Sequence, residues 1–336
     1  MKIAVVGASG AVGRKIIQEL EASQSIDSDC ELLFFASARS EGQKIPFRQK
    51  QGLVKAWSLD AIRGCDYILM SAGGSFSREY AQAIVADGGI LIDNSSAWRM
   101  TDQIPLVVPE VNGSVLKGFT QGIIANPNCS TIQMLVSLKP LADNFGLEMV
   151  QVSTYQSVSG SGQKGIRELE NQSSGNTGDY DAEVSLYSQP IGNNVIPAIG
   201  AIEQDGYCEE ELKMIHETRK ILDLPNLAVL ATTVRVPAFH CHSESITVKL
   251  KKPVCREEVV ESFQSMDGLV YSQDDKIADI PSPYHCAGRR EVFVGRLRLL
   301  HGQTKSNWLQ YWNVADNLLK GAATNAVQIL EKLISS

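Results

Sequence analysis

The chain has little of three features that mark broad functional classes: positive charge, long apolar runs and paired cysteines. Its 31 Lys and Arg residues are outnumbered by 38 Asp and Glu residues, which gives a formal net charge of −7. Nonspecific binding to nucleic acid or to an anionic membrane requires a basic surface, so we expect neither partner. An anionic ligand must therefore be held by a few well-placed arginines, lysines and helix ends.

No stretch of the sequence approaches the ~20 uninterrupted apolar residues that a membrane-spanning helix needs. The chain also begins directly with a strand-like segment, Lys2 to Val6, without the basic and apolar regions of a signal peptide. We therefore expect a soluble cytoplasmic protein.

The seven cysteines are odd in number, scattered along the chain and free of any CxxC pair. This distribution argues against a disulfide framework and a zinc ribbon, and it favours a reducing compartment. His240-Cys241-His242 and His285-Cys286 are a conceivable set of metal ligands. Adjacent residues of a strand face opposite sides of a sheet, however, so these side chains cannot all bind one ion, and we expect no metal site.

The length of the chain, 336 residues, favours two domains, since one domain usually has ~100–200 residues. In the first part, apolar strands alternate with amphipathic helices. This alternation predicts an α/β domain with a doubly wound parallel sheet, whose ligands lie beyond the carboxyl ends of the strands. The predicted strands are Lys2–Val6, Glu31–Ala36, Asp66–Ser71, Gly89–Asp93 and Gln121–Ala125, with helices through Leu20 and about Asp87.

The first strand is followed by a glycine-rich turn and a helix, the order typical of a phosphate cradle in a Rossmann-type domain. The spacing is GxxGxxG instead of the commoner GxGxxG, and a tight turn before a helix is the alternative. We interpret the turn as a nucleotide-binding loop because it lies in the first strand-turn-helix unit. The residues concerned are Gly7, Ser9, Gly10, Ala11, Val12 and Gly13.

The end of the second predicted strand indicates which nucleotide is bound. NAD-selective proteins place an Asp or Glu there for the ribose 2′-hydroxyl, whereas this chain has Ser37, Arg39 and Ser40. An arginine flanked by hydroxyls suits a 2′-phosphate and therefore favours NADP. Glu41 lies close by and counts against this interpretation, and a surface arginine in a polar loop is the alternative.

Three further loops follow predicted strands and should converge on one crevice. Cys129, in the last of them, begins an apolar-periodic helix, and the positive end of a helix lowers the pKa of a thiol. This position favours a nucleophile over a buried structural cysteine, and N–H groups at the same helix start are candidates to hold a developing oxyanion. Arg99 is a candidate anion binder. The loops are Ser71-Ala72-Gly73-Gly74, Asn94-Ser95-Ser96 and Asn126-Pro127-Asn128-Cys129.

Beyond about Leu147 the pattern changes to alternating β-branched segments, which predict a second, α+β domain with a mostly antiparallel sheet. Residues Ser157 to Pro197 are too many for a plain connector, so we interpret them as a binding or interface excursion. The last helix, Val314 to Leu333, should return to the first domain, because a helix that long needs a partner face. The predicted strands are Val150–Tyr155, Ala228–Val236, Ser245–Leu250 and Glu291–Leu300, with a helix over Glu209–Leu222.

Several polar residues of this second part are candidates for chemistry. Arg235 ends a strand and could clamp a carboxylate, and His242 begins the next strand with a pKa suited to acid–base work. The alternative for His242 is a satisfied strand-end histidine. Glu210 and Lys213 share one helix face and could bind an ammonium and an anion, or they could form only a solvated salt bridge.

Six motifs in register over nearly the whole chain resemble bacterial aspartate-semialdehyde dehydrogenase. They are Gly7-Ala8-Ser9-Gly10-Ala11-Val12-Gly13, Ser37-Ala38-Arg39-Ser40, Asn94-Ser95-Ser96-Ala97-Trp98-Arg99-Met100, Asn126-Pro127-Asn128-Cys129-Ser130-Thr131, Tyr155-Gln156-Ser157-Val158-Ser159-Gly160 and His242-Ser243-Glu244-Ser245. One motif would be modest support, but six in order are highly specific.

The resemblance implies an enzyme that interconverts L-aspartate 4-semialdehyde, phosphate and NADP+ with 4-phospho-L-aspartate and NADPH. The reductive direction serves biosynthesis of lysine and diaminopimelate, threonine, methionine and isoleucine. The implied assembly is a homodimer or a tetramer. The implied domains are residues 1–128 for NADP, completed by a C-terminal helix over 315–336, and residues 129–314 for catalysis and dimerisation.

The resemblance also implies a role for each candidate residue. Cys129 would be the nucleophile, His242 the acid–base and Gln156 the residue that orients the reacting carbonyl. Arg235 would hold the substrate carboxylate and Glu210 its ammonium. Lys213 and Arg99 would bind phosphate, and the residues implied at the cofactor, besides the loops above, are Ser71, Ala72, Gly73, Asn94, Ser159, Gly160 and Asn325.

Two alternatives stay open. An N-acetyl-glutamyl-phosphate reductase shares this logic, but its substrate has no free ammonium for Glu210, and such enzymes typically have Gly where Asn128 stands here. A non-catalytic NADP-binding homologue is the other. One departure from the resemblance is Cys241, where relatives more often have a glycine before the histidine, so the local backbone could differ.

Overall fold

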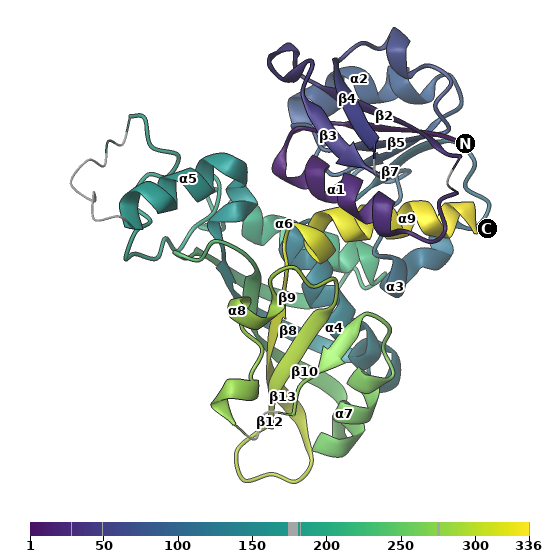
Figure 1. Cartoon of the computed structure of the whole chain (residues 1–336). Coiled ribbons are helices and arrows are strands. Elements are labelled where there is room, and N and C mark those ends of the chain that lie inside the picture. The colour runs from purple at the N-terminus through teal and green to yellow at the C-terminus, as the bar shows by residue number, and fades with distance from the viewer. Residues whose placement is uncertain (28, 49, 174–180, 182, 274–275, 336) are drawn as a thin grey trace. The chain divides into compact units, whose positions relative to one another are not determined.

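The structure is a computed structural model of the chain and describes residues 1–27, 29–48, 50–173, 181, 183–273 and 276–335. The chain forms two compact units (Figure 1). The first unit comprises Met1–Pro127 with Ala322–Ser336, and the second comprises Asn128–Gly321. Among the residues just given, no helix has the length and apolar character required to span a membrane.

The sheet of the first unit has seven strands in its described part, in the order β3-β4-β2-β1-β5-β6-β7. All neighbours from β4 to β7 pair in parallel, and only the β3–β4 pair is antiparallel. The predicted Rossmann-type parallel sheet is therefore confirmed. The strands are β1 (Lys2–Val6), β2 (Glu31–Ala36), β3 (Lys44–Phe47), β4 (Lys50–Ala56), β5 (Tyr67–Met70), β6 (Ile90–Asp93) and β7 (Gly122–Ala125).

Helices cover both faces of this sheet. Figure 1 shows α1 (Ala11–Ala22) and α9 (Thr324–Ile334) side by side on one face and α2 (Gly74–Val85) on the other. α9 belongs to this unit by its bonds: the Thr324 hydroxyl donates to Glu19, and Ser23 donates to Glu331. The shorter helical turns are α3 (Pro109–Asn112), η1 (Ala38–Ser40), η2 (Asp60–Ile62) and η3 (Gly113–Leu116).

The last helix begins later than the sequence predicted. Residues 314 and 315 end strand β13 instead, where they pair with the start of β10. Asp316 then accepts hydrogen bonds from the N–H groups of Leu318 and Leu319 and so forms a turn. A π-helical segment, Leu319–Ala323, precedes α9. The predicted start at Val314 was wrong because these apolar residues are buried in a strand, and residue 336 lies outside the described residues.

The sheet of the second unit has the order β11-β12-β13-β10-β8-β9 in the described residues. The central pairs are antiparallel, and the β11–β12 and β8–β9 pairs are parallel, so the predicted mostly antiparallel sheet is confirmed. The strands are β8 (Leu147–Gln156), β9 (Ala228–Arg235), β10 (His242–Val254), β11 (Leu269–Tyr271), β12 (Val292–Leu299) and β13 (Ser306–Ala315).

One face of this sheet packs against helices, with the long α4 (Cys129–Phe145) lying over β10, β8 and β13. Figure 1 shows α7 (Arg256–Gln264) on the same side as α4. The predicted excursion over 157–197 contains α5 (Gly162–Ser173), and residues 174–180 and 182 of it lie outside the described residues. The other helical segments are α6 (Glu209–Ile221), α8 (Pro283–Cys286), η4 (Val158–Ser161) and η6 (Ile277–Asp279).

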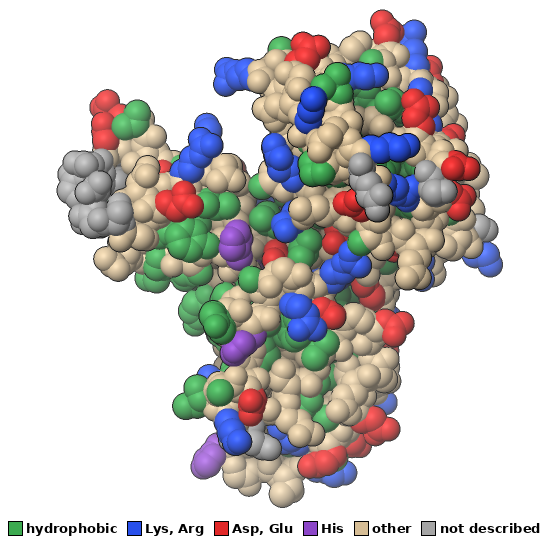
Figure 2. Space-filling view, in the orientation of Figure 1, with side chains coloured by type: hydrophobic (Ala, Val, Ile, Leu, Met, Phe, Trp, Pro, Cys, Tyr) green, Lys and Arg blue, Asp and Glu red, His purple; other side chains and the backbone are tan. Residues whose placement is uncertain are grey.

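Charged side chains of both signs are interspersed over the face drawn in Figure 2, without a continuous basic surface there. This agrees with the excess of acidic residues in the sequence.

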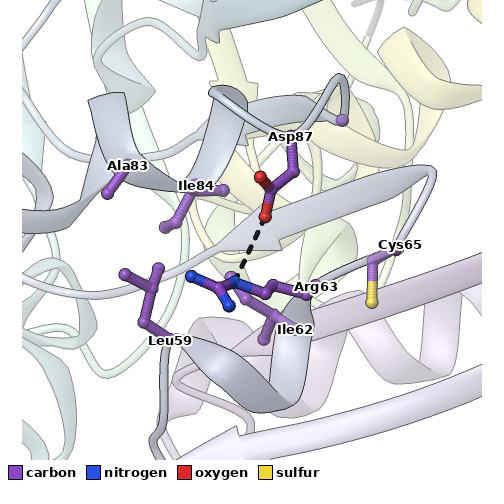
Figure 3. A pocket seen from close by; sticks show the side chains of 9 residues that line it. Leu59, Ile62, Arg63, Cys65, Ala83, Ile84 and Asp87 are labelled. Carbon is purple, nitrogen blue, oxygen red and sulfur yellow. Dashed lines mark ion pairs between the residues drawn. The ribbon is translucent and has the colours of Figure 1, made fainter.

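A cavity of about 10 Å³ lies in the first unit, where Arg63 reaches across to Asp87 at 3.4 Å (Figure 3). This volume is about that of one water probe. Cys65 and Gly89, which help to line the cavity, come just before β5 and β6, so the cavity lies at the amino ends of the strands. It is therefore at the opposite edge of the sheet from the loops that the sequence singled out.

Candidate active site

The start of α4 fixes the position of Cys129. Asn128 is the N-cap residue, and its Oδ1 accepts hydrogen bonds from the N–H groups of Ser130 and Thr131 at 3.0 and 3.2 Å. The predicted oxyanion site at this helix start therefore already has two of its N–H groups occupied. A Cβ on Gly321 would come within 2.8 Å of the Cys129 Cβ, so a glycine there leaves the room that Cys129 needs.

Two carboxylates of α6 hold Asn128 in turn. Asn128 Nδ2 donates to Glu210 Oε1 at 2.8 Å, and its backbone N–H donates to Glu217 Oε2 at 2.6 Å. Both glutamates are buried, and a spacing of seven residues places them on one face of the helix. Glu217 is not among the residues predicted from the sequence, although its i, i+7 relation to Glu210 was a readable signal.

Three predicted site residues form a row across adjacent strands. In the sheet register, Gln156 of β8 lies opposite Arg235 of β9 on one side and opposite His242 of β10 on the other. All three side chains are buried. The carboxyl ends of β8 and β9 thus meet the amino end of β10, and residues distant in sequence become neighbours.

Gln156 is held at both ends of its amide. Its Oε1 accepts a hydrogen bond from Thr154 Oγ1 at 3.1 Å, and its Nε2 donates to Glu210 Oε1 at 3.1 Å. The first contact lies within β8, and the second reaches α6. The orientation of this amide is therefore set before any substrate binds.

Glu210 is the common acceptor of this site, because Lys213 Nζ also donates to its Oε2 at 3.2 Å. Burial raises the pKa of Glu210, but the charge of Lys213 and the hydrogen bonds from its three donors outweigh that effect. The pKa therefore lies below its usual value, and Glu210 is ionised at neutral pH. The i, i+3 pair of the sequence analysis exists, but it is partly buried instead of fully solvated.

His242 is completely buried, and its Nδ1 accepts a hydrogen bond from the backbone N–H of Ser157 at 3.1 Å. Burial and the charge of Arg235 lower the pKa of His242 from 6.5 to about 3, and Glu210 opposes only part of that shift. The ring is therefore neutral, and because Nδ1 accepts, its proton lies on Nε2. Among the described residues, Nε2 has no hydrogen-bond partner.

Arg235 and Gly160 complete this corner. Arg235 Nη1 donates to the carbonyl oxygen of Ser157 at 2.7 Å, while its buried Nε has no partner within the described part of the chain. A Cβ on Gly160 would lie 2.9 Å from Arg235 Nη1 and 3.2 Å from His242 Nε2. Gly160 therefore keeps the space between the guanidinium and the imidazole clear.

Ser159, assigned to the cofactor from the sequence, lies in the same corner. Its hydroxyl bonds Ser157 Oγ at 3.0 Å and Asn317 Oδ1 at 3.1 Å, and Ser157 Oγ also contacts the same Asn317 oxygen. Ser159 and Gly160 thus lie in the same corner as the His242 side chain. Asn317 was missed by the sequence analysis, since nothing in its local pattern marks it.

Cys241 has the backbone conformation of a glycine. Its φ of 66° lies in the left-handed region, which L residues adopt at a cost of roughly 1–2 kcal/mol. The substitution noted in the sequence therefore places a side chain at a backbone conformation that glycine adopts without this cost. The Cys241 side chain instead joins a buried cluster with Cys286, Phe293 and Val314.

The glycine loop of the first unit has the close contacts that a nucleotide cradle requires. Gly7 has φ +84°, and a Cβ there would lie 2.2 Å from the carbonyl oxygen of Ser71. A Cβ on Gly13 would lie 2.1 Å from the carbonyl oxygen of Gly7. Gly10 is the N-cap of α1 and provides no side-chain cap, so the first N–H groups of the helix have no side-chain acceptor. Ser9, Ala11 and Val12 lie in the same turn.

The other predicted cofactor residues of this unit lie at the same edge of the sheet. Ser37 and Arg39 are exposed at the end of β2, and Ser40 is half-buried beside them. Ser71 and Ala72 follow β5, and Gly73 is the N-cap of α2, again without a side-chain cap.

A chain of amides joins the loops after β6 and β7 to the start of α9. Asn126 Nδ2 donates to Asn94 Oδ1 at 2.9 Å, and Asn325 Nδ2 donates to Asn126 Oδ1 at 2.7 Å. Asn94 Nδ2 also donates to the carbonyl oxygen of Met70, at the end of β5. Arg99 is buried in this unit and donates to the carbonyl oxygen of Asn94 at 2.9 Å.

Within the described residues, no group of three or more His, Cys, Asp or Glu side chains is arranged to hold a metal ion. None of the seven cysteines forms a disulfide with another described residue.

Comparison with known domain families gives two matches. Residues 2–119 match the family described as semialdehyde dehydrogenase, NAD binding domain, and residues 138–320 match the family described as semialdehyde dehydrogenase, dimerisation domain.

Relatives match over nearly the full chain. The aspartate-semialdehyde dehydrogenase of Aquifex aeolicus is 46% identical, with 99% of this chain and 98% of that protein covered. Aspartate-semialdehyde dehydrogenase 2 of Vibrio cholerae is 42% identical, with 99% and 97% covered.

A solved structure is similar in fold as well. The crystal structure of aspartate semialdehyde dehydrogenase II from Vibrio cholerae has a TM-score of 0.92 and 41% identity, covering 100% of this chain and 98% of that one. The chain belongs to the aspartate-semialdehyde dehydrogenase family.

Proposed function

We propose that the chain catalyses the reversible, phosphate-dependent conversion of L-aspartate 4-semialdehyde to 4-phospho-L-aspartate, with NADP as the redox partner and reduction as the biosynthetic direction. The observation that carries the proposal is the row of Arg235, Gln156 and His242 on three neighbouring strands, together with Cys129 at a rigidly capped helix start. A solved relative from Vibrio cholerae is described as complexed with ASA.

In the oxidative direction, the Cys129 thiolate attacks the aldehyde carbon. A C–S bond forms, and the carbonyl electron pair moves to oxygen, which takes a proton from water and gives a thiohemiacetal hydroxyl. NADP+ supplies the hydride acceptor when it is bound. Loss of the hydride leaves a thioester, and phosphate oxygen then attacks this carbon while the C–S bond breaks and releases the Cys129 thiolate. The reductive direction is the reverse.

His242 would move the proton of the reacting oxygen. With its proton on Nε2, the resting ring suits a hydrogen bond to the oxygen on which negative charge develops. To accept the hydroxyl proton at Nε2, the ring must change to the Nδ1–H tautomer. Ser157 Oγ, 3.3 Å from Nδ1, is an acceptor for that proton. The low pKa of His242 leaves the ring unprotonated at neutral pH, which is the state that a base requires, and it also makes the ring a weaker base than an ordinary histidine.

The charged groups of the substrate have matching candidates. Arg235, with a buried and unpartnered Nε in the described part of the chain, would hold the carboxylate. Ionised Glu210 would take the substrate ammonium, which supports an unacetylated aspartate derivative over an N-acetyl-glutamyl one. Lys213 and Arg99 would bind phosphate, and Gln156 would orient the carbonyl.

The residues present fit NADP. The first N–H groups of α1 and α2 have no side-chain cap, which suits a pyrophosphate, and exposed Arg39 with Ser37 and Ser40 suits a 2′-phosphate. Asn94, Asn325, Ser71, Ala72, Ser159 and Gly160 would complete the cofactor site. We assign residues 1–128 with the C-terminal helix to NADP binding and residues 129–314 to catalysis and dimerisation.

We further propose a homodimer formed through the sheet face of the second unit that lies opposite α4. Tyr155 and Leu230 on this face are 41% and 47% exposed, and Tyr155 and Trp312 lie with ring centroids 5.4 Å apart. Exposed apolar side chains gathered on one face typically mark an interface. Light scattering would distinguish this dimer from a monomer or a tetramer. From the biosynthetic role we also propose a cytoplasmic location, which cell fractionation would check.

The test is an assay of NADPH formation. Purified protein should form NADPH from NADP+ and L-aspartate 4-semialdehyde only when phosphate is present. N-acetyl-glutamyl semialdehyde should be a poor substrate. If active controls succeed and this protein gives no phosphate-dependent signal, the proposed activity is wrong.

The role of Cys129 has its own test. Cys129→Ala should lower kcat by at least about 10⁴-fold, since the covalent step is lost, while NADP+ binding persists. Appreciable residual turnover with normal cofactor binding would mean that another residue is the nucleophile.

A further inference from the structure

A buried carboxyl group lies beneath the row of site residues, two positions from His242 on the same strand. Glu244 lies on β10 and is 0% exposed. In the sheet register it is opposite Thr154 of β8 on one side and opposite Asn313 of β13 on the other. α4 covers this face of the sheet and contributes Gln133. The mechanism proposed above does not use Glu244.

Two amides surround this carboxyl group. Asn313 Nδ2 donates to Glu244 Oε2 at 2.9 Å and to the carbonyl oxygen of Gln133 at 3.1 Å. Gln133 also hydrogen-bonds Glu244, and its Nε2 donates to the carbonyl oxygen of His242 at 3.3 Å. Gln133 thus connects the carboxyl group to the backbone of His242.

The cluster has more acceptors than donors. Three buried oxygens have no partner among the described residues: Glu244 Oε1, Gln133 Oε1 and Asn313 Oδ1. The two amide oxygens belong to the same amides that bond Glu244. An unsatisfied buried acceptor is costly, and one added proton would supply the missing donor. In the described part of the chain, Glu244 has no ion-pair partner.

We propose that Glu244 keeps its proton at neutral pH and acts as a positioning residue, whose hydroxyl locks Gln133 against the backbone of His242. This inference rests on the proposed role of His242 as the acid–base residue. Ionisation of Glu244 would place an uncompensated charge behind His242 and remove the donor that the cluster lacks.

The groups that face Glu244 support the neutral state. Burial raises the pKa of Glu244 to about 8, and the hydrogen bonds from Gln133 and Asn313 lower it only in part. On β13, Tyr311 is completely buried and its pKa is raised, so it is neutral as well. On β10, His242 is neutral. The facing residues of β8 and α4, Thr154, Gln133 and Ser137, do not titrate.

The experiment compares Glu244→Gln and Glu244→Leu with wild type, measuring kcat and KM from pH 6 to pH 10. Glu244→Gln keeps a neutral donor and should retain kcat at pH 7 within about 3-fold, whereas Glu244→Leu should lose about 10-fold or more in kcat with little change in KM. Wild-type kcat should fall as pH rises above about 8, and Glu244→Gln should lack this decline. Glu261→Gln, the same change on the exposed face of α7, is the control.

Two results would overturn the proposal: a Glu244→Gln variant as impaired as Glu244→Leu at pH 7, or one that keeps the alkaline decline. Because Glu244→Leu could fail to fold, a second measurement uses infrared difference spectra of wild type and Glu244→Gln. A protonated carboxyl band at pH 7 that is absent from the variant is expected, and an ionised carboxylate there would contradict it. If His242→Asn retained full activity, the proposed function would fail, while the infrared result would still decide the protonation of Glu244.

Discussion

The helices of the two units begin in different ways. In the first unit, α1 and α2 follow parallel strands and have glycine N-caps, Gly10 and Gly73, with no side-chain hydrogen bond to the helix. In the second unit, α4 is capped by the Asn128 side chain, and α6 and α7 have reciprocal capping boxes. The first arrangement leaves N–H groups for a ligand, and the second satisfies them internally.

This difference separates two uses of a helix start. Open starts suit the phosphates of a cofactor, because the helix itself provides the binding groups. At α4 the helix start positions a side chain instead, and the N–H groups of Ser130 and Thr131 are already bonded to Asn128. In the mechanism proposed above, stabilisation of a developing oxyanion would therefore fall to other donors, of which His242 Nε2 is a candidate.

Several variants test whether the two kinds of helix start differ in this way. The variant that removes the side-chain cap of α4 should have the largest effect on catalysis. Asn128→Ala loses a cap worth about 1 kcal/mol and removes one of the three side-chain donors of Glu210, the one nearest in sequence to Cys129. We expect kcat to fall about 100-fold from misplacement of Cys129, with NADP+ binding unchanged. Steady-state kinetics and calorimetric titration of NADP+ measure the two effects.

Asn112→Ala is the matched control in the first unit. Its side chain accepts from the N–H of Val108 and donates to the carbonyl oxygen of Leu106, so its loss should lower the free energy of unfolding. It should leave kcat nearly unchanged. Equal losses of kcat in the two variants would mean that Asn128 acts through stability alone.

Adding a side-chain cap to an uncapped helix start of the first unit should raise stability and weaken cofactor binding. Gly73→Asp supplies a capping carboxylate at a position with no atom within 4 Å of the new Cβ. The variant should gain stability by about 0.3–1 kcal/mol, while NADP+ affinity falls about 10-fold because the site loses N–H groups and gains a negative charge. Thermal unfolding and NADP+ titration test this, with Gly73→Ala as the uncharged control. Unchanged affinity in Gly73→Asp would exclude the start of α2 from the cofactor site.

Ser157→Ala should have a smaller effect. It removes the hydroxyl that could accept from the Nδ1–H tautomer of His242, while the backbone N–H that bonds Nδ1 in the resting state remains. We expect kcat to fall about 10-fold with little change in KM, since only the base form loses its partner. A kcat equal to that of wild type across the pH range would remove Ser157 from the proton path.

The smallest expected effect concerns stability and pH. The pKa of His242 is lowered from 6.5 to about 3 in the folded chain, so below pH 6.5 the unfolded chain takes up a proton that the folded chain excludes. Wild type therefore loses stability as pH falls from 6.5 towards 3, and His242→Asn lacks this loss. The melting temperature of the variant minus that of wild type should therefore increase as the pH is lowered from 7 to 5. A constant difference would show that His242 titrates normally when folded.

The sequence predicted the parallel strands well because each is a short apolar run with glycines or polar residues at its ends. It missed β3 and β4, whose sequences contain Pro46 and several lysines and read as loop. β3, which contains Pro46, is the edge strand of the sheet, where a proline and charged residues are tolerated, and β4 lies next to it. β13 was missed as a strand because residues 306–315 mix tryptophans with polar residues.

Some residues of the candidate site could likewise be predicted from the sequence, and others could not. Cys129, Arg235 and His242 could be named as candidates because each follows or begins a predicted element and has a side chain suited to chemistry. Asn317 was not readable, and of Glu217 only its place on the helix face of Glu210 was, because their hydrogen bonds join segments far apart in the chain. Such contacts depend on strand register and helix packing, which local patterns do not encode.

The burial of Cys241 and Cys286 also has a practical consequence for chemical labelling. Burial raises the pKa of both thiols, that of Cys286 to about 11, so neither is a reactive thiolate at neutral pH. The pKa values of three further thiols are raised as well, and Cys208 is buried. A mild electrophile at neutral pH should therefore modify Cys129 selectively in the wild-type chain, and covalent probes or inhibitors could be directed to that position without removing other cysteines.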